Sequence, residues 1–527
     1  MKLDPVRCSL TYLVGQDYIE AVCRARAFLT GADAVALKRL ADEKVEWWPE
    51  SLRRRLHELL PQAGQPVVAP LTASPSGAGT RAFQDATRTS RAPLSGLGYF
   101  RVGEDGRLYV TSKSEHYHAP LGHSFPGYEL LERARNLGIP NATHNNSRGS
   151  VTRRLEEQLV RAANGLAPNA NLDAVHRSVE PTVLNRVLNL ETGSLAVEAA
   201  VKLALCRFFR HEPGGPEPIY RSRVPVFLVL GDDDGAVIAN YHGTTIVTQT
   251  MRGLWPELSA RWQKDGTLRV HPVRPNSIAD LDEAFLRFEK PPYKIAAFCH
   301  EIIMMNYGAR RLTEEFLHHA YRLCAAHDVP AIADEIQSCL WYEGLFLFRQ
   351  YGLKPAMVAI GKGFTGGEFP ASRLLFSARF DVLPQFGALV TNGQEELASL
   401  AYLVALKWTT ANGPAITAAG HRLEQDFLLL AEEFPKQIAG VEGRGHLLGL
   451  RFHDLTCART FVETMNQMGF DISVQAYKKD CPPVALTKLP TIADEIVISF
   501  MKDRMRRALR QGEAGQSVSR GVLPSGD

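Results

Sequence analysis

Short runs of apolar residues alternate with longer amphipathic segments through the middle of the chain. The apolar runs cover residues 225–230, 294–305, 329–335 and 357–363. Segments with helical spacing of apolar residues lie between them, notably at 194–209 and 313–328. Strand and helix alternating at this spacing predict an α/β protein, with a mostly parallel central sheet that helices cover on both faces.

Other patterns divide the rest of the chain. A stretch rich in Pro, Ala, Ser, Thr and Gly at 61–96 is typical of a linker or surface arm. Residues 98–112 predict two short strands around the turn Asp105-Gly106. We expect five parts: a helical extension and linker at 1–95, the first part of a small domain at 96–165, a large domain at 166–410, the C-terminal part of the small domain at 411–512, and a flexible tail at 513–527.

Composition narrows the function classes. The formal net charge of +3 arises from 60 basic and 57 acidic residues, so no basic excess favours nucleic acid as a partner. No run approaches the roughly 18 apolar residues that span a bilayer, and the N-terminus lacks a signal core. The eight cysteines form no CxxC pair, which gives a zinc site or redox dithiol little support, and we expect no metal site. We expect a protein of the reducing cytoplasm.

Two ionisable residues end two of the apolar runs. Asp334 closes the run at 329–335, and Lys362 lies between two glycines at the end of 357–363. In parallel sheets, polar residues at the carboxyl ends of strands face the ligand crevice. A buried acid needs a partner, and a lysine in a low-dielectric cleft can lose its proton and become a Schiff-base nucleophile. Alternatively, Lys362 extends to solvent and Asp334 caps a helix.

Two further motifs fit the same crevice. Thr192-Gly193-Ser194 precedes an Ala-rich helix, where hydroxyls and backbone amides form an anion site, although a simple N-cap has the same pattern. Tyr241-His242-Gly243 follows a strand-like segment, and the tyrosine would either stack on a planar ring or belong to the core.

In this order the motifs resemble those of the class III (ω-type) aminotransferases, which are fold-type I pyridoxal-phosphate enzymes. The matching pieces are the small-residue turn before the Ala-rich helix, Tyr-His-Gly, Ala-Asp-Glu-Ile-Gln at 333–337 and Gly-Lys-Gly at 361–363. The resemblance covers roughly residues 95–510. It implies the fold-type I architecture, with a smaller α+β domain built from N- and C-terminal parts, and pyridoxal 5'-phosphate as the cofactor.

The resemblance also implies roles for single residues. Lys362 would hold the cofactor as a Schiff base and move the substrate proton, and Asp334 would pair with the pyridine nitrogen. Gln337 would reach the phenolic oxygen. The remaining implied contacts are Ile336 and Tyr241 on opposite ring faces, His242 beside the tyrosine, and Thr192, Gly193 and Ser194 at the phosphate. Thr391 resembles the threonine that reaches the phosphate of the neighbouring subunit, which implies a homodimer with shared active sites.

The implied reaction is transfer of an amino group from an amine or amino acid to a keto acid or aldehyde. Aminomutases, racemases and decarboxylases share the fold, and a non-catalytic descendant remains an alternative. The chain departs from the family pattern at Tyr342-Glu343, where Arg-Thr is usual, and at Glu301-Ile302, where Glu-Pro is usual. No arginine is assigned as a clamp for a substrate carboxylate.

Overall fold

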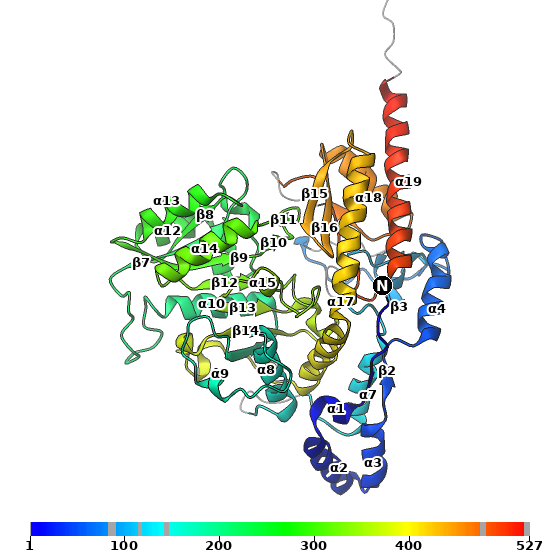
Figure 1. Ribbon diagram of the computed structural model, residues 1–527, viewed down its shortest axis with the longest axis horizontal. Coiled ribbons are helices and arrows are strands. Elements are labelled where there is room, and N and C mark those ends of the chain that lie inside the picture. The colour runs from blue at the N-terminus through cyan, green and yellow to red at the C-terminus, as the bar shows by residue number, and fades with distance from the viewer. Residues whose placement is uncertain (1, 83–90, 114–118, 142–146, 475–480, 521–527) are drawn as a thin grey trace, which may run out of the picture. The chain divides into compact units, whose positions relative to one another are not determined.

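The structure is a computed structural model that describes residues 2–82, 91–113, 119–141, 147–474 and 481–520 (Figure 1). The linker expected at 61–96 and the tail expected at 513–527 therefore lie partly outside the described residues. The chain divides into two compact units. The first contains residues 1–6, 46–127 and 414–527, and the second contains residues 7–45 and 128–413.

A seven-stranded sheet forms the centre of the second unit. In spatial order its strands are β6 (Arg186–Leu190), β14 (Ser372–Phe376), β13 (Met357–Ile360), β12 (Ala331–Asp334), β9 (Tyr293–His300), β7 (Val224–Leu230) and β8 (Arg269–Val273). Strand β14 is antiparallel to both of its neighbours, and the other four pairings are parallel. The prediction of a mostly parallel sheet is confirmed.

The strands are apolar because helices bury them. Every residue of β12 and β13 is buried. Helix α10 (Gly193–Leu205) packs against β13 and β14, and its small side chains at Ala196 and Ala200 belong to the same core as Phe227 of β7 and Met357 of β13. Burial on both faces explains why these strands appear in the sequence as continuous apolar runs.

The structure describes further helices in this unit. They are α1 (Leu10–Val14), α2 (Gln16–Thr30), α3 (Ala34–Asp42), α7 (Glu129–Asn136), α8 (Ser150–Ala163), α9 (Asp173–Arg177), α11 (Ile246–Met251), α12 (Pro256–Lys264), α13 (Ile278–Phe288), α14 (Glu314–Ala326), α15 (Leu347–Gln350) and α16 (Gln385–Ala388). The helices predicted at 194–209 and 313–328 are confirmed as α10 and α14. In Figure 1, α12 and α13 lie beside β8 at one edge of the sheet, and both contact it.

The segment of residues 7–45, which begins with β1 (Arg7–Cys8), folds into the second unit. Within it, the Thr11 hydroxyl donates to a carboxylate oxygen of Asp42 at 2.6 Å. Arg133 of α7 donates to the backbone oxygen of Glu43 at 2.6 Å, and pairs with Glu129 at 2.8 Å. Because Arg133 is buried, these bonds anchor the N-terminal helices to the body of the unit.

The first unit contains two antiparallel sheets. One has the order β3 (Pro93–Leu97), β4 (Phe100–Gly103), β5 (Leu108–Val110), and the other β15 (Ile438–Arg444), β16 (Leu447–Phe452), β18 (Val484–Thr487), β17 (Ser473–Val474). The hairpin predicted at Asp105-Gly106 is confirmed by the pairing of β4 and β5. The helices are α4 (Glu50–Leu59), α18 (Leu455–Gln467) and α19 (Glu495–Arg520).

Besides the short 3-10 helix Pro126–Tyr128, two described elements cross the boundary between the units. They are β2 (Val45–Glu46) and the long helix α17 (Glu396–Glu433), in which Pro414 marks the division. Across the described ranges, no helix combines the length and the apolar character needed to cross a bilayer.

Candidate active site

The acid and the lysine singled out in the sequence follow neighbouring strands. Asp334 is the last residue of β12 and pairs in register with Ala359 of β13, while Lys362 comes two residues after β13 ends at Ile360. Since β12 and β13 are parallel, both residues lie at the same edge of the sheet. Lys362 has a φ of 46°, a left-handed conformation that costs a non-glycine residue on the order of 1 kcal/mol. Such strain at a buried strand end is typical of functional sites.

Asp334 forms a buried pair with His242. Nδ1 of the histidine lies 2.8 Å from Oδ2 of the aspartate, and the second carboxylate oxygen accepts the backbone N–H of Ile336 at 3.1 Å. Nε2 of His242 is buried and has no hydrogen-bond partner among the described residues. Since a carboxylate has about four acceptor positions, Asp334 retains room for another donor.

Lys362 lies in an environment that favours its neutral form. Burial lowers the pKa of its amine below the ordinary 10.5, while the charges of Glu301 and Asp334 act in the opposite direction. Glu301 is buried directly after β9 and accepts a hydrogen bond from Nε2 of Gln337 at 3.3 Å. The predicted residues Lys362, Asp334 and Gln337 therefore share one region with an acid that we did not predict.

The start of α10 carries the expected cluster of small polar residues. Thr192 is the N-cap, and its hydroxyl accepts the N–H of Leu195 at 3.4 Å. Its backbone oxygen accepts the Ser372 hydroxyl at 2.6 Å, which ties the turn to β14. Ser194 accepts the N–H of Thr244 at 3.1 Å. With the helix N-terminus behind them, these residues can bind an anion.

Glycine is required at the two closest approaches in this cluster. A Cβ on Gly193 would lie 2.5 Å from Cδ1 of Ile336. Gly243 has a φ of 138°, and a Cβ there would lie 2.8 Å from Cα of Ser194. Gly243 thus packs against the start of α10, and Gly193 packs against Ile336. Both approaches are so close that only glycine fits.

Two predicted residues lie differently. Tyr241 is half-buried, and the Arg252 guanidinium lies 5.0 Å from the centre of its ring. Thr391 is exposed in the turn before α17, and within the described part of the chain it makes no hydrogen bond to the other predicted residues. The structure therefore brings eight of the ten predicted residues together around the ends of β12 and β13 and the start of α10, while Tyr241 and Thr391 form no hydrogen bond to them within the described ranges.

Glu335 is a second acid that the sequence reasoning did not select. Its buried carboxylate accepts the Ser338 hydroxyl at 2.5 Å and the backbone N–H groups of Leu347 and Phe348 at 3.1 and 2.6 Å. Burial raises its pKa to about 7, against the effect of these hydrogen bonds. Glu335 thereby connects the end of β12 to the start of α15 and fixes the loop that carries Ile336 and Gln337.

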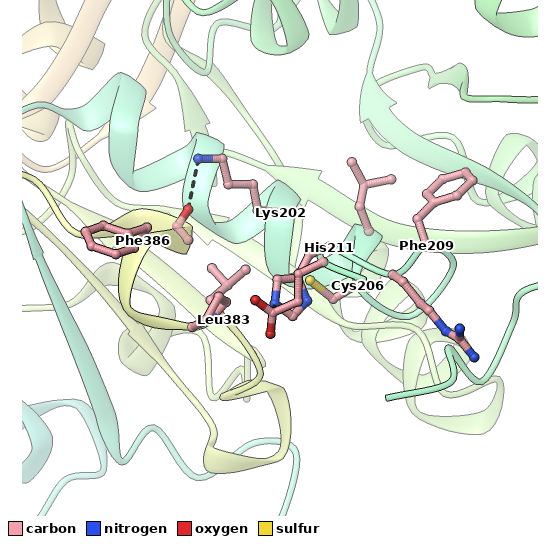
Figure 2. Close-up of a pocket in the computed structure, with 11 residues that line it drawn as sticks. Lys202, Cys206, Phe209, His211, Leu383 and Phe386 are labelled. Atoms are coloured by element: carbon pink, nitrogen blue, oxygen red, sulfur yellow. Dashed lines mark hydrogen bonds and ion pairs between the residues drawn. The ribbon is translucent and has the colours of Figure 1, made fainter. Parts of the chain in front are cut away.

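A separate cavity of about 480 Å³ lies near the opposite end of α10, where Figure 2 shows Lys202, Cys206 and Phe386 around it. Nζ of Lys202 donates to the backbone oxygen of Gly387 at 3.1 Å. None of the residues that line this cavity is a predicted site residue. This cavity is therefore distinct from the group of predicted residues at the N-terminal end of α10.

Comparison with known proteins shows the family to which the chain belongs. The family model described as aminotransferase class-III matches residues 92–495. The chain belongs to the class-III aminotransferase family. It is 26% identical over 360 residues to acetylornithine aminotransferase of Brucella melitensis biotype 1, covering 68% of this chain and 78% of the relative. It is 28% identical over 283 residues to mitochondrial ornithine aminotransferase of Arabidopsis thaliana, covering 51% and 53%.

Solved structures share the fold of this class-III aminotransferase. Ornithine aminotransferase from Toxoplasma gondii aligns with a TM-score of 0.64 at 18% identity, over 82% of this chain and 94% of the other. N-acetylornithine aminotransferase from Stenotrophomonas maltophilia aligns with a TM-score of 0.59 at 20% identity, over 82% and 99%. The fold is that of the fold-type I enzymes, and the protein is a pyridoxal-phosphate-dependent aminotransferase.

The residues present fit this cofactor. A buried carboxylate with a free acceptor position suits a protonated pyridine nitrogen, and the small residues at the N-terminus of α10 suit a phosphate. The close approach of Gly193 to Ile336 brings the turn at residues 192–194 and the loop after β12 together, as one bound molecule requires.

Proposed function

We propose that Lys362 is the amine to which the cofactor bonds, and that it carries the proton of the amino-group transfer. Its position beside Asp334, at the edge shared by β12 and β13, is the observation that carries this proposal. When bound, the cofactor supplies an electron sink for the substrate carbon. A lowered pKa leaves more of the Lys362 amine unprotonated near neutral pH, so its Nζ can accept a proton and return it.

The other residues hold and orient the cofactor in this proposal. Asp334 binds the ring nitrogen, and His242 keeps the carboxylate in place through its Nδ1 contact. Gln337 reaches the phenolic oxygen. Ile336 and Tyr241 enclose the ring from its two faces. Thr192, Gly193 and Ser194 bind the phosphate with their hydroxyls and backbone N–H groups.

Thr391 has a different place in the proposal. Its exposure supports a role on a second subunit. We propose a homodimer in which Thr391 of each subunit binds the phosphate at the other subunit's site. We also propose a cytoplasmic location, because none of the eight described cysteines forms a disulfide.

The relatives' names suggest the substrates to test first. Two of them are called acetylornithine and ornithine aminotransferase. We propose that the amino donor is an amine or amino acid of this kind and that the acceptor is a keto acid or aldehyde. Ornithine, N-acetylornithine and simple primary amines with 2-oxoglutarate form the first panel.

The test follows the cofactor's visible absorption while donors are added without an acceptor. Conversion of the bound cofactor to its aminated form supports amino-group transfer. Unchanged cofactor with chemically altered donor would instead indicate a mutase, racemase or decarboxylase. Lys362→Ala is expected to abolish turnover and covalent attachment, as measured by mass spectrometry after borohydride reduction. Lys354→Ala removes an exposed lysine from the segment before β13 and serves as the matched control.

A further inference from the structure

A second and larger cavity lies in the unit formed by residues 7–45 and 128–413, and it involves none of the proposed cofactor residues. Its volume is about 780 Å³, within the usual range of roughly 300–1,000 Å³ for small-molecule sites. Side chains from α1, α8, α15 and α17 contribute to its wall, including Tyr12 and Leu13 of the N-terminal segment.

Four of the side chains that line the cavity are basic. They are Arg154, Arg161, Arg349 and Lys407, and Glu343 is the one acidic residue among the lining residues that the structure describes. Arg161 is paired with Glu157 at 3.3 Å. The other three basic side chains have no ion pair with any described residue, so the cavity carries an excess of positive charge. A recess with one sign of charge concentrates counter-ions from solution.

Neutral contacts hold two of these cations in place. Arg349 donates to the backbone oxygen of Ala162 at 3.1 Å, and a Cβ on Gly165 would lie 2.5 Å from its guanidinium. Nζ of Lys407 donates to the Tyr12 hydroxyl at 3.2 Å and lies 4.8 Å from the centre of that ring. These contacts orient the cations without neutralising them.

Arg154 completes the set. It projects from α8 close to the turn between α1 and α2, where a Cβ on Gly15 would lie 3.3 Å from one of its guanidinium nitrogens. A guanidinium binds carboxylate and phosphate through two parallel hydrogen bonds. The apolar side chains of Leu13, Leu166 and Leu403 form the rest of the wall and suit a short carbon skeleton.

We propose that this cavity is a binding site for a small organic anion with at least two acidic groups, either carboxylate or phosphate. The anion binds Arg154, Arg349 and Lys407 and thereby connects α1 to α8 and α17. Its binding therefore stabilises the attachment of residues 7–45 to the rest of the unit.

The first experiment is calorimetric titration of the cofactor-loaded full chain at low salt with two probes, citrate and inorganic pyrophosphate. Loading with cofactor keeps the phosphate site at α10 filled. Binding of citrate alone assigns the site to carboxylates, binding of pyrophosphate alone assigns it to phosphates, and either result supports the proposal. Absence of binding by both probes at millimolar concentration overturns it.

Variants decide where the probes bind. Arg154→Gln combined with Lys407→Met is expected to weaken binding about tenfold or more, because each loses a charge-assisted contact. Lys264→Gln, an exposed lysine at the end of α12, is the matched control and keeps the parent affinity. Equal affinity in the double variant overturns the proposal.

Further experiments test the binding site separately from the folding of the double variant and from catalytic activity. If the double variant does not fold, the single variant Arg154→Gln takes its place in the titration. This substitution breaks no ion pair with a described residue. Limited proteolysis is expected to release residues 7–45 more slowly when the probe is present. Lys362→Ala is expected to bind the probe with the same affinity as the parent. The experiment therefore distinguishes an error in the proposed role of Lys362 from an error in the proposed anion site.

Discussion

Nδ1 of His242 lies 2.8 Å from Oδ2 of Asp334, and the two side chains are only 2% and 5% exposed. The histidine comes from the turn before α11 and the aspartate from the end of β12, so 92 residues of chain separate the partners. Because a buried polar group needs a partner, the pair holds the carboxylate in position. In the function we propose, this carboxylate binds the ring nitrogen of the cofactor.

Replacing Asp334 tests the charge of this pair. Asp334→Asn is expected to lower kcat by about 100-fold or more, because an amide cannot neutralise a protonated ring nitrogen. His242→Gln keeps the carboxylate and removes only the ring that orients it, so we expect a smaller loss of about tenfold. Steady-state kinetics and titration of the apoenzyme with pyridoxal phosphate measure both effects. Parent kcat in Asp334→Asn, with circular dichroism unchanged, would rule out this role for the carboxylate.

Glu301 should control the protonation of Lys362. The negative charge of Glu301 raises the pKa of that amine, so Glu301→Gln is expected to lower the lysine pKa further. The amide retains an oxygen that can accept the hydrogen bond from Gln337. The rate at which pyridoxal phosphate attaches to the apoenzyme depends on neutral amine, and its pH profile is expected to shift to lower pH. A profile that coincides with that of the parent would show that Glu301 does not act on the lysine.

The acid and the lysine were predictable because the signal is local. Each ends an apolar run, and adjacent parallel strands bring such ends to the same edge of the sheet. Glu301 follows the same rule at the end of β9, but the apolar residues 302–305 continue beyond it. The sequence therefore shows one continuous apolar run at 294–305, and it gives no sign that the strand ends at His300. A search for acids inside long apolar runs would have found this residue.

The place of residues 7–45 could not be predicted from the sequence. Composition indicates helices there, but it cannot show which part of the chain they pack on. That depends on single long-range contacts, such as Arg133 with the backbone of Glu43. The basic cavity has the same origin, because its walls come from four helices far apart in sequence and no local motif marks them.

The close contact between Gly193 and Ile336 gives a prediction about cofactor affinity. Gly193→Ala would place a methyl group 2.5 Å from Cδ1 of Ile336, so the isoleucine must move away from the ring face that we assign to it. We expect the dissociation constant of pyridoxal phosphate to rise about tenfold. Ile336→Val lacks that Cδ1 atom, and the double variant is expected to bind better than Gly193→Ala alone. Additive effects of the two substitutions in equilibrium dialysis would show that the residues do not interact in this way.

Glu335 makes stability depend on pH, and the direction follows from its shifted pKa. Burial raises the pKa of Glu335 from the ordinary 4.5 to about 7, so between these values the folded chain holds a proton that the unfolded chain has released. Stability from this group is therefore present below pH 4.5 and is lost as the pH rises to about 7. Conversion of the pKa difference gives a loss of roughly 3 kcal/mol at most.

Glu335→Gln removes this titration while retaining an oxygen for the N–H of Phe348. The free energy of unfolding of the variant, minus that of the parent, is expected to increase between pH 4.5 and 7.5 and to stay constant above that. Urea titrations at fixed pH values measure the difference, and Glu432→Gln, an exposed acid on α17, is the control for which the difference should stay flat. Parallel curves of unfolding free energy against pH for the parent and Glu335→Gln would contradict the prediction. They would show that Glu335 has the same pKa in the folded and the unfolded chain.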